Sequence, residues 1–426
     1  MSQKVMTREE MQIVLTQMCE KAVVASRALA AMSASDKKRC LNVMADELIN
    51  NIPALLDANG KDMDKAVANN LSSAMLDRLR LDEKRIRGMA EGLRQVAAQE
   101  DPVGKVLSSV VRPNGLRIDK VCVPLGVIAI IFESRPNVTA DAAGICIKAG
   151  NAVILRGGSE ALHSNIAIAG IMNRAGIMAG LPDGAVQLID WTDHAAVNLL
   201  LKMNQYIDLV IPRGGERLIR TVVEQSTIPV IKHYKGVCHL YVDFPCNVAQ
   251  AVKIITNAKV QRPSACNAVE TVLINRDILD EFLPPFLTAM KANGVRLKGG
   301  PEFQKLFPDA EPATEEDFYN EYLDLILSVR IVDDVIAAVE HINKYGSRHS
   351  DGILSSRQEN INYFLSQVDS STVYANASTR FTDGGEFGMG AEIGISTDKL
   401  HARGPMGVNE LTSYKYIVLG DGQIRE

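Results

Sequence analysis

The sequence predicts an α/β protein with two doubly wound parallel sheets and a separate β-hairpin. Strand-like and helical segments alternate after residue 126, the first hundred residues show only helical periodicity, and a hairpin pattern lies between these regions. The length of 426 residues favours two or three domains, because a single core stops growing near ~250–300 residues. Its 46% hydrophobic and 23% charged residues are typical of a globular protein and exclude a disordered one.

The first hundred residues carry apolar side chains at helical spacing. Thr7 and Glu10 form a capping box before the first pattern, and Ser35 precedes the second. A further stripe ends before Asp101 and Pro102, a pair that stops helices. Because amphipathic helices bury one face, we expect these stripes to form core rather than a site.

Residues 107–126 predict a β-hairpin. Asn114 and Gly115 lie between two β-branched runs, which is the strongest short-range signal for a hairpin. A hairpin this long has no core of its own, so we expect it to lean on another domain or subunit. The strand-like run at 412–419 is expected to join the same sheet.

Repeated strand, loop and helix units after the hairpin predict the two parallel sheets. We expect the strands of the first sheet at residues 126–132, 151–156, 185–189 and 208–212. We expect the strands of the second at residues 239–243, 270–275, 325–332 and 371–376.

Composition excludes several classes of function. The 46 basic and 51 acidic residues give a net charge of −5, without the basic excess that binding to nucleic acid requires. Seven cysteines without a Cys-x-x-Cys pair fit neither a disulfide framework nor a zinc site, so we expect no metal. The first residues lack an apolar signal segment, and no apolar run approaches the ~20 residues that cross a bilayer. We therefore expect a cytoplasmic protein with no membrane partner.

Cys266 is the cysteine most open to a chemical role. It lies in the polar sequence QRPSACNA, between a helical run and a predicted strand. Arg262 and the free amides of such a loop would stabilise the thiolate, which is the nucleophilic form. The alternative is a small loop residue without chemistry, and the residues alone leave both open. We expect the other six cysteines to be buried hydrophobic residues.

Two Gly-Gly turns follow predicted strands. The first is Arg156, Gly157, Gly158 and Ser159, and the second is Arg213, Gly214, Gly215 and Glu216. Bare amides and a positive side chain at a helix N-terminus suit a pyrophosphate or a 2′-phosphate. Neither turn matches the dinucleotide or Walker pattern, so plain tight turns remain the alternative.

Two further regions could contribute to a site. Asn137 follows the predicted strand at 126–132 and stands at the sheet edge where open α/β folds bind ligands. A turn asparagine that bonds its own backbone is the alternative. The segment at 376–407 is long, weakly regular and rich in glycine, and it contains Arg380 and Arg403. Segments of this kind in compact proteins are usually functional.

Several long blocks resemble the aldehyde dehydrogenase superfamily and, within it, the family of γ-glutamyl phosphate reductases, or glutamate-5-semialdehyde dehydrogenases. The blocks are VPLGVIAIIFESRPNVTADAAGICIKAGNAVILRGGSEALHSN, QRPSACNAVET, EYLDLILSVR and NASTRFTDGGEFGMGAEIGISTDKLHARGPMG. The resemblance covers nearly the whole chain. It implies an aldehyde dehydrogenase-like fold with two doubly wound domains and an oligomerisation hairpin.

The resemblance also implies domain roles and boundaries. It predicts a nucleotide-binding domain at 1–106 and 127–235 and a catalytic domain at 236–407. Residues 107–126 with 408–420 would form the oligomerisation element of a homo-oligomer.

Roles for individual residues follow from the resemblance. Cys266 matches the family's nucleophile, and Asn137 is the candidate for the oxyanion-hole amide. The expected cofactor-binding residues are Arg156, Gly157, Gly158, Ser159, Gly214, Gly215 and Glu321. Arg262, Arg380 and Arg403 are candidates for binding the substrate's phosphate or α-carboxylate, since guanidinium pairs bidentately with both.

Two departures from the hydrolytic aldehyde dehydrogenases refine the expected function. Their general-base glutamate has no counterpart in the sequence HYKGVC at 233–238, so a thioester on Cys266 would survive for reduction. Many NAD-using relatives carry a glutamate three residues after the position of Arg156, where Ser159 stands here. A 2′-phosphate would meet no carboxylate at that position, which favours NADPH.

The resemblance therefore implies NADPH-dependent reduction of L-glutamyl 5-phosphate to L-glutamate 5-semialdehyde, the second step of proline biosynthesis. Functional association with the preceding enzyme, glutamate 5-kinase, is a further expectation. One alternative is an acylating aldehyde dehydrogenase that uses coenzyme A. Another is a catalytically inactive homologue that serves as a binding scaffold.

Overall fold

The structure is a computed structural model that describes residues 6–425, and these form two compact units. The first unit contains the chain up to Lys232, together with Gly388–Gly394 and the residues from Met406 onward. The second unit contains His233–Phe387 and Ile395–Pro405. Residues 388–394 and 406–407 thus lie in the first unit, although the sequence placed them with the catalytic domain. The Ile393 amide donates to Met406 and so joins these two segments, and Nε2 of Gln99 in the first unit donates to the Met389 carbonyl.

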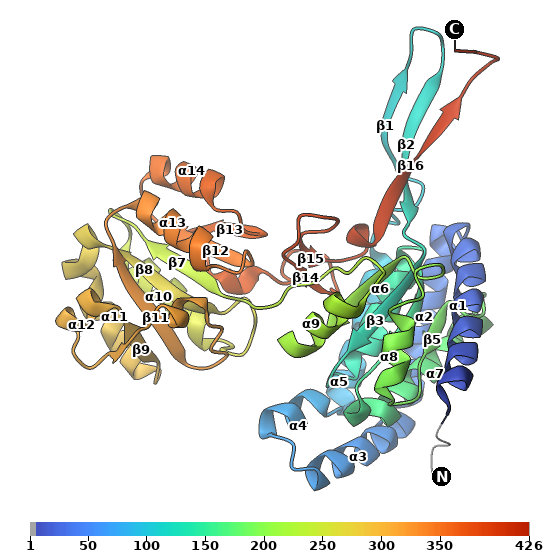
Figure 1. Cartoon of the computed structure of the whole chain (residues 1–426), viewed down its shortest axis with the longest axis horizontal. Helices are drawn as coiled ribbons and strands as arrows, with labels where there is room; N and C mark the ends of the chain where they lie inside the picture. The colour runs from blue at the N-terminus through green and yellow to red at the C-terminus, as the bar shows by residue number, and fades with distance from the viewer. Residues whose placement is uncertain (1–5, 426) are drawn as a thin grey trace. The chain divides into compact units, whose positions relative to one another are not determined.

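Nine helices among the described residues belong to the first unit (Figure 1). They are α1 (Arg8–Ala30), α2 (Ala34–Asn50), α3 (Ile52–Ala68), α4 (Ser73–Leu79), α5 (Glu83–Ala98), α6 (Asn137–Lys148), α7 (Leu162–Met178), α8 (His194–Leu200) and α9 (Glu216–Gln225). The capping box of Thr7 and Glu10 is confirmed. The second cap is Ser33 rather than Ser35, because the Ser33 side chain accepts from the Asp36 amide.

A four-stranded parallel sheet forms the centre of the first unit. It contains β3 (Val127–Phe132), β4 (Ala152–Arg156), β5 (Val186–Leu188) and β6 (Leu209–Arg213), in the order β5-β4-β3-β6. Helices α6 and α7 pack together and against α2, whereas α1 packs against α8 and β4. Every residue of β3 is buried, as expected for a strand covered on both faces. The loops after β3, β4 and β6 meet at one edge of the sheet.

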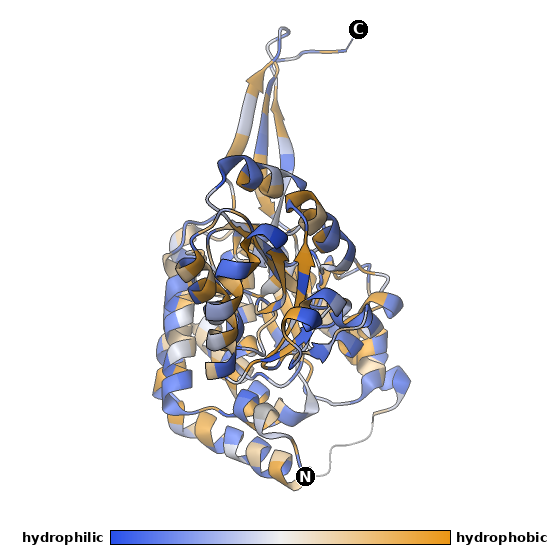
Figure 2. Ribbon diagram, turned by 90° about the vertical axis from the view of Figure 1, so that its left-hand side faces the viewer, coloured by the Kyte–Doolittle hydropathy of each residue, from blue (hydrophilic) through white to orange (hydrophobic). Residues whose placement is uncertain are grey.

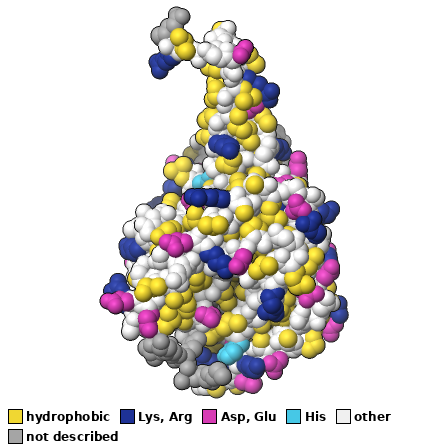
Figure 3. Space-filling model, turned by 90° about the vertical axis from the view of Figure 1, so that its right-hand side faces the viewer, with side chains coloured by type: hydrophobic (Ala, Val, Ile, Leu, Met, Phe, Trp, Pro, Cys, Tyr) yellow, Lys and Arg dark blue, Asp and Glu magenta, His cyan; other side chains and the backbone are white. Residues whose placement is uncertain are grey.

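The hairpin and the C-terminal strand form a separate antiparallel sheet, as the sequence predicts. Strands β1 (Val106–Val111) and β2 (Arg117–Pro124) flank the turn, and β16 (Thr412–Leu419) pairs with β2. Gly115 has a φ of 86°, which glycine adopts without strain. All of β1 and most of β16 are exposed. Many side chains on the surface of this antiparallel sheet are hydrophobic (Figure 3).

A seven-stranded parallel sheet forms the second unit. Its strands are β7 (Cys238–Val242), β8 (Val269–Asn275), β9 (Arg296–Gly299), β10 (Glu311–Pro312), β11 (Ile326–Val332), β12 (Ser350–Leu354) and β13 (Thr372–Ala375), in the order β10-β9-β11-β8-β7-β12-β13. Its helices are α10 (Val248–Val260), α11 (Leu279–Ala292), α12 (Pro301–Leu306), α13 (Val335–Tyr345) and α14 (Gln358–Gln367). The sequence missed β9, β10 and β12.

Alternation along the central strands explains why both faces of this sheet are covered. Leu240 and Val242 of β7 belong to a core that includes residues of α10 and α11, whereas Tyr241 faces a second core with α13 and α14. The central strands are largely hydrophobic, whereas the helices carry both hydrophobic and hydrophilic residues (Figure 2).

Short elements complete the chain. They are the 3₁₀ turns η1 (Ser159–Ala161), η2 (Arg276–Ile278), η3 (Glu316–Tyr319), η4 (Thr379–Phe381) and η5 (Asn409–Leu411), and the strands β14 (Gly394–Ser396) and β15 (Gly404–Met406). Within residues 6–425, none of the helices has the length and apolar character needed to cross a membrane.

Candidate active site

Cys266 lies in the loop between α10 and β8, as predicted. Two overlapping turns shape this loop: the Ala265 amide donates to the Arg262 carbonyl at 3.1 Å, and the Ala268 amide donates to the Ala265 carbonyl at 2.9 Å. The Cys266 side chain is half-buried, whereas the next residue, Asn267, is buried. The thiol is therefore held on an ordered turn with part of its surface accessible.

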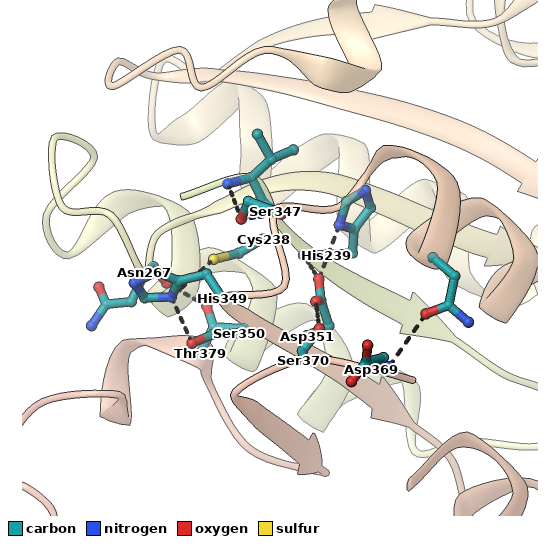
Figure 4. Close-up of polar contacts among 12 residues, drawn as sticks. Cys238, His239, Asn267, Ser347, His349, Ser350, Asp351, Asp369, Ser370 and Thr379 are labelled. Carbon is teal, nitrogen blue, oxygen red and sulfur yellow. Dashed lines mark hydrogen bonds and ion pairs between the residues drawn. The ribbon is translucent and has the colours of Figure 1, made fainter. Parts of the chain in front are cut away.

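The segment before β7 supports the nucleophile from behind. A Cβ on Gly236 would lie 1.8 Å from the Cys266 carbonyl oxygen, so only glycine permits this approach. The Cys238 thiol donates to the same carbonyl at 3.3 Å. It also lies 3.8 Å from Nδ1 of His349 (Figure 4). Burial raises the pKa of Cys238, which keeps this thiol protonated and able to donate.

Hydrogen bonds of Asn267 connect the segment that contains η4 to the loop that contains Cys266. Its Nδ2 donates to the carbonyl oxygens of Arg380 at 3.3 Å and Thr382 at 2.8 Å. In return, Oγ1 of Thr379 donates to the Asn267 carbonyl at 2.7 Å (Figure 4). The turn η4 is thus held beside Cys266 by three hydrogen bonds. Asn267 is not among the site residues predicted from the sequence, although its position next to Cys266 was a signal.

Two of the three candidate arginines lie together near Cys266. Burial lowers the pKa of Arg380, the positive charge of Arg262 lowers it further, and the negative charge of the Cys266 thiolate raises it. Nε of Arg380 donates to Gln261, at the end of α10, at 2.7 Å. Two like charges held near each other favour an anion between them.

The third candidate, Arg403, is engaged elsewhere in the second unit. Its Nη2 donates to both the carboxylate and the backbone carbonyl of Asp369, each at 2.9 Å. The structure therefore links Arg262 and Arg380 to the nucleophile loop and links Arg403 to Asp369.

Glu321 lies in the loop between η3 and β11 and is half-buried. A buried ion pair supports this loop: Glu270 accepts from Nζ of Lys259 at 2.6 Å and from the amide of Leu323 at 3.3 Å. Burial raises the pKa of Glu270 to about 7, and the charge of Glu321 contributes to that rise. Glu321 therefore lies close to this ion pair.

The first Gly-Gly turn lies at the end of β4 in the first unit. Arg156 is only 7% exposed and donates through Nη2 to the Thr192 carbonyl at 3.2 Å. Its Nε and the Nδ2 of Asn165 are buried without a hydrogen-bond partner in the described part of the chain. A Cβ on Gly157 would lie 2.1 Å from that Nδ2. Ser159 begins η1, and neither η1 nor α7 has a side-chain cap hydrogen bond.

A carboxylate, that of Glu160, lies at the same turn although Ser159 stands at the position that bears a glutamate in many NAD-using relatives. Oε1 of Glu160 accepts from both the amide and the hydroxyl of Ser134, at 2.6 and 2.9 Å. A Cβ on Gly158 would lie 2.3 Å from this carboxylate. The charge of Glu160 raises the pKa of Arg156, against the lowering by burial. A 2′-phosphate at Arg156 would therefore also meet Glu160.

The second Gly-Gly turn has a similar arrangement. Gly215 is the N-cap of α9, and its amide donates to Oε2 of Glu133 at 2.9 Å. A Cβ on Gly214 would lie 2.3 Å from the same oxygen. A side chain at Gly214 would therefore have to displace the Glu133 carboxylate, which packs against the backbone of this turn.

Asn137 is the first residue of α6. Its Nδ2 donates to Oδ2 of Asp141 at 2.8 Å, one helical turn further along. Burial raises the pKa of Asp141 to about 6, although the bond from Asn137 lowers it. One amide hydrogen of Asn137 is thus engaged within its own helix.

The residues around the first Gly-Gly turn fit a dinucleotide better than a metal ion. Unpartnered donors of Arg156 and Asn165 adjoin a glycine turn at the ligand-binding edge of a parallel sheet, as a phosphate or ribose would require. Among residues 6–425, no group of three or more His, Cys, Asp or Glu side chains is placed to hold a metal.

Comparisons with known proteins agree with the family resemblance. A family model described as "Aldehyde dehydrogenase family" matches residues 5–304. The gamma-glutamyl phosphate reductase of Caldanaerobacter subterraneus subsp. tengcongensis is 55% identical over 407 residues, which cover 96% of this chain and 98% of that protein. The gamma-glutamyl phosphate reductase of Moorella thermoacetica is 54% identical and covers similar shares, 96% and 97%.

Solved structures agree as well. The crystal structure of gamma-glutamyl phosphate reductase from Thermotoga maritima has a TM-score of 0.95 and 43% identity, with 97% of this chain and 100% of that chain covered. An acetylating aldehyde dehydrogenase from Geobacillus thermoglucosidasius, at 18% identity and a TM-score of 0.69 over 98% and 99% of the two chains, shares the fold. The predicted fold class and family are confirmed: the chain belongs to the aldehyde dehydrogenase family and, within it, to the γ-glutamyl phosphate reductases.

Proposed function

We propose that the chain catalyses NADPH-dependent reduction of L-glutamyl 5-phosphate to L-glutamate 5-semialdehyde, with release of phosphate, through a thioester on Cys266. This is the second step of proline biosynthesis from glutamate. The observation that carries the proposal is that Arg262 lies in the turn before Cys266 and that the Arg380 carbonyl accepts from Asn267, the residue after Cys266, because two guanidinium groups near a nucleophile suit an acyl phosphate. The names of the relatives support the same reaction.

The proposed reaction begins with attack of the Cys266 thiolate on the acyl carbon. The electron pair of the carbonyl moves to oxygen, and the resulting oxyanion accepts from the Cys266 amide and from Asn137. Each such donor contributes roughly 3–4 kcal/mol to the stability of the transition state. When the carbonyl re-forms, the bond to phosphate breaks, and Arg262 and Arg380 neutralise the departing phosphate.

The thioester must then persist until it is reduced. In hydrolytic relatives a glutamate activates water, and the sequence HYKGVC at 233–238 supplies no carboxylate. Gly236 lies against the Cys266 backbone, so this segment packs closely behind the loop. Both features support reduction rather than hydrolysis.

Residues of the first unit would hold the cofactor. Arg156, Gly157, Gly158, Ser159, Gly214 and Gly215 are the proposed nucleotide-binding residues, with Glu321 of the second unit for the nicotinamide ribose. NADPH, when bound, would supply the hydride that reduces the acyl group. The C–S bond to Cys266 then breaks as the carbonyl re-forms, which releases the semialdehyde and regenerates the Cys266 thiolate. We propose NADPH rather than NADH because the positive charge of Arg156 can bind a 2′-phosphate. Arg156 keeps this charge although it is buried, since arginine stays protonated in proteins.

The reverse reaction tests this function. Purified wild-type protein receives L-glutamate 5-semialdehyde and NADP⁺, with phosphate, coenzyme A or neither as the acyl acceptor. We expect NADP⁺ reduction only with phosphate, and slower reduction of NAD⁺ at equal concentration. Turnover with coenzyme A alone would favour the acylating alternative. Failure of every acceptor, together with no binding of NADPH in a fluorescence titration, would favour an inactive scaffold.

We also propose that the sheet of β1, β2 and β16 joins subunits in a homo-oligomer. Its apolar residues Val110, Val111, Tyr416 and Val418 are each about half exposed or more. A sheet this apolar has no core of its own within one chain. Light scattering should give a mass that is a multiple of 46.4 kDa, and V110D/V418D should reduce it to that of one chain.

A further inference from the structure

A carboxylate, Asp383, lies next to the segment that is fastened to the nucleophile loop. The residue before it, Thr382, accepts a hydrogen bond from Nδ2 of Asn267 at 2.8 Å. The negative charge of Asp383 raises the pKa of Arg380, as the Cys266 thiolate also does. Asp383 therefore lies on a segment that is hydrogen-bonded to the residue after Cys266, and its charge acts on Arg380.

The hydrogen bonds that fix the Asp383 side chain involve only one of its two carboxylate oxygens. Its Oδ1 accepts from the amides of Gly385 at 2.9 Å and Glu386 at 3.3 Å, which fixes the side chain on its turn. The side chain is exposed. Across residues 6–425 it forms no ion pair with Arg262 or Arg380. The turn uses Oδ1 and makes no use of Oδ2.

The charges of this group match those of the proposed substrate. L-Glutamyl 5-phosphate carries two anionic groups, the phosphoryl group and the α-carboxylate, and one cation, the α-ammonium group. The site carries two guanidinium groups, on Arg262 and Arg380, and one carboxylate. Two arginines alone would bind any dicarboxylate-like acyl phosphate, so the carboxylate is the feature that can select an amino acid.

We propose, building on the proposed function, that Asp383 binds the α-ammonium group of the substrate and so determines specificity for an α-amino acid. A charge-assisted hydrogen bond between ammonium and carboxylate stabilises the bound amino acid. A substrate without the amino group leaves Asp383 unpaired, and the enzyme gains nothing from its presence.

The experiment compares two aldehydes in the phosphate-dependent reverse reaction. One is L-glutamate 5-semialdehyde, and the other is 5-oxopentanoate, which differs only in lacking the amino group. The variant is Asp383→Asn, because the asparagine Oδ1 can still accept from Gly385 and Glu386 and keep the turn. Asp383→Ser is a second variant with a shorter cap. Glu386→Gln removes a neighbouring exposed carboxylate from the same loop and is the matched control.

We expect Asp383→Asn to lower kcat/KM for L-glutamate 5-semialdehyde by about 10- to 100-fold and to leave kcat/KM for 5-oxopentanoate unchanged. Glu386→Gln should change neither. Equal losses on both aldehydes in D383N and D383S, or no loss on either, would overturn the assignment of Asp383. If the wild-type protein does not oxidise L-glutamate 5-semialdehyde with phosphate, the proposed function fails and this inference fails with it.

Discussion

Replacing Gly236 by alanine should disable the candidate active site while leaving the fold intact. The new Cβ would lie 1.8 Å from the Cys266 carbonyl oxygen, 2.5 Å from its carbon and 2.7 Å from the Cys266 Cα. Contacts under 3.0 Å do not occur for real Cβ atoms, so the loop must move away by at least about 1.2 Å. Gly236 has no positive φ, so the alanine backbone itself adds no strain.

The expected loss of activity follows from that displacement. Misplacing a reacting group by about 1 Å costs roughly 100-fold in rate, so G236A should reduce kcat by about 100-fold or more. The KM for NADP⁺ should change little, because the proposed nucleotide turns belong to the other unit. Phosphate-dependent reduction of NADP⁺ by L-glutamate 5-semialdehyde measures both constants.

Gly300→Ala provides the matched control in the same unit. Gly300 has no atom within 4 Å of an added Cβ, and its φ is not positive. G300A should therefore retain the wild-type rate. Circular dichroism and thermal unfolding would verify that both variants are folded. A folded G236A protein as active as G300A would refute the idea that this close approach positions the nucleophile.

Three further predictions concern single side chains. Arg380→Lys should raise the KM for phosphate in the reverse reaction by about ten-fold, because the bidentate contact is lost, whereas Arg403→Lys should have a smaller effect; equal effects would contradict the pairing of arginines. Glu160→Gln should raise the preference for NADPH over NADH by about five-fold, since a charge near Arg156 is removed; an unchanged preference would contradict this. Burial lowers the pKa of His341 to about 2, so the ring stays neutral in the folded protein. Below pH ~6.5 the unfolded chain binds a proton at this histidine and the folded protein does not, so the free energy of unfolding falls by up to about 1.4 kcal/mol per pH unit. Urea unfolding of His341→Gln between pH 7 and 5 should lack this slope, and an identical slope in both proteins would refute it.

Local patterns were sufficient for the elements whose own side chains determine their structure. The predicted strand at 412–419 coincides with β16, and the Asn114–Gly115 turn joins β1 and β2. The continuous apolar run at 126–132 appears as β3, which is fully buried. In each case the periodicity or turn chemistry lies within a few neighbouring residues.

Strand β12 shows why other elements were missed. Its sequence, SDGIL, begins with a serine, an aspartate and a glycine, which are rare in buried strands. Asp351 is nonetheless fully buried, because its Oδ1 accepts from the amide of His239 at 2.7 Å and lies 2.9 Å from the His239 Nδ1. The partners that make this strand possible lie more than a hundred residues away in the sequence.

The residues of the candidate site divide in the same way. Cys266 and Arg262 could be chosen from one short loop, because their proposed chemistry depends on residue type and local sequence. Asn267, Gly236 and Glu160 act through contacts with distant backbone atoms, such as the Thr382 carbonyl and the Ser134 amide. Such contacts become visible only once the fold brings the segments together.

The measurement that tests the central claim most directly is turnover by Cys266→Ala in the phosphate-dependent reduction of NADP⁺ by L-glutamate 5-semialdehyde. The proposed thioester requires the sulfur of Cys266, so we predict a loss of kcat by at least about 10³-fold with the fold retained. Cys238→Ala, which removes a buried thiol but not the nucleophile, should keep substantial activity. Turnover by C266A near the wild-type rate would contradict the account, because the acyl group would then need no bond to this cysteine.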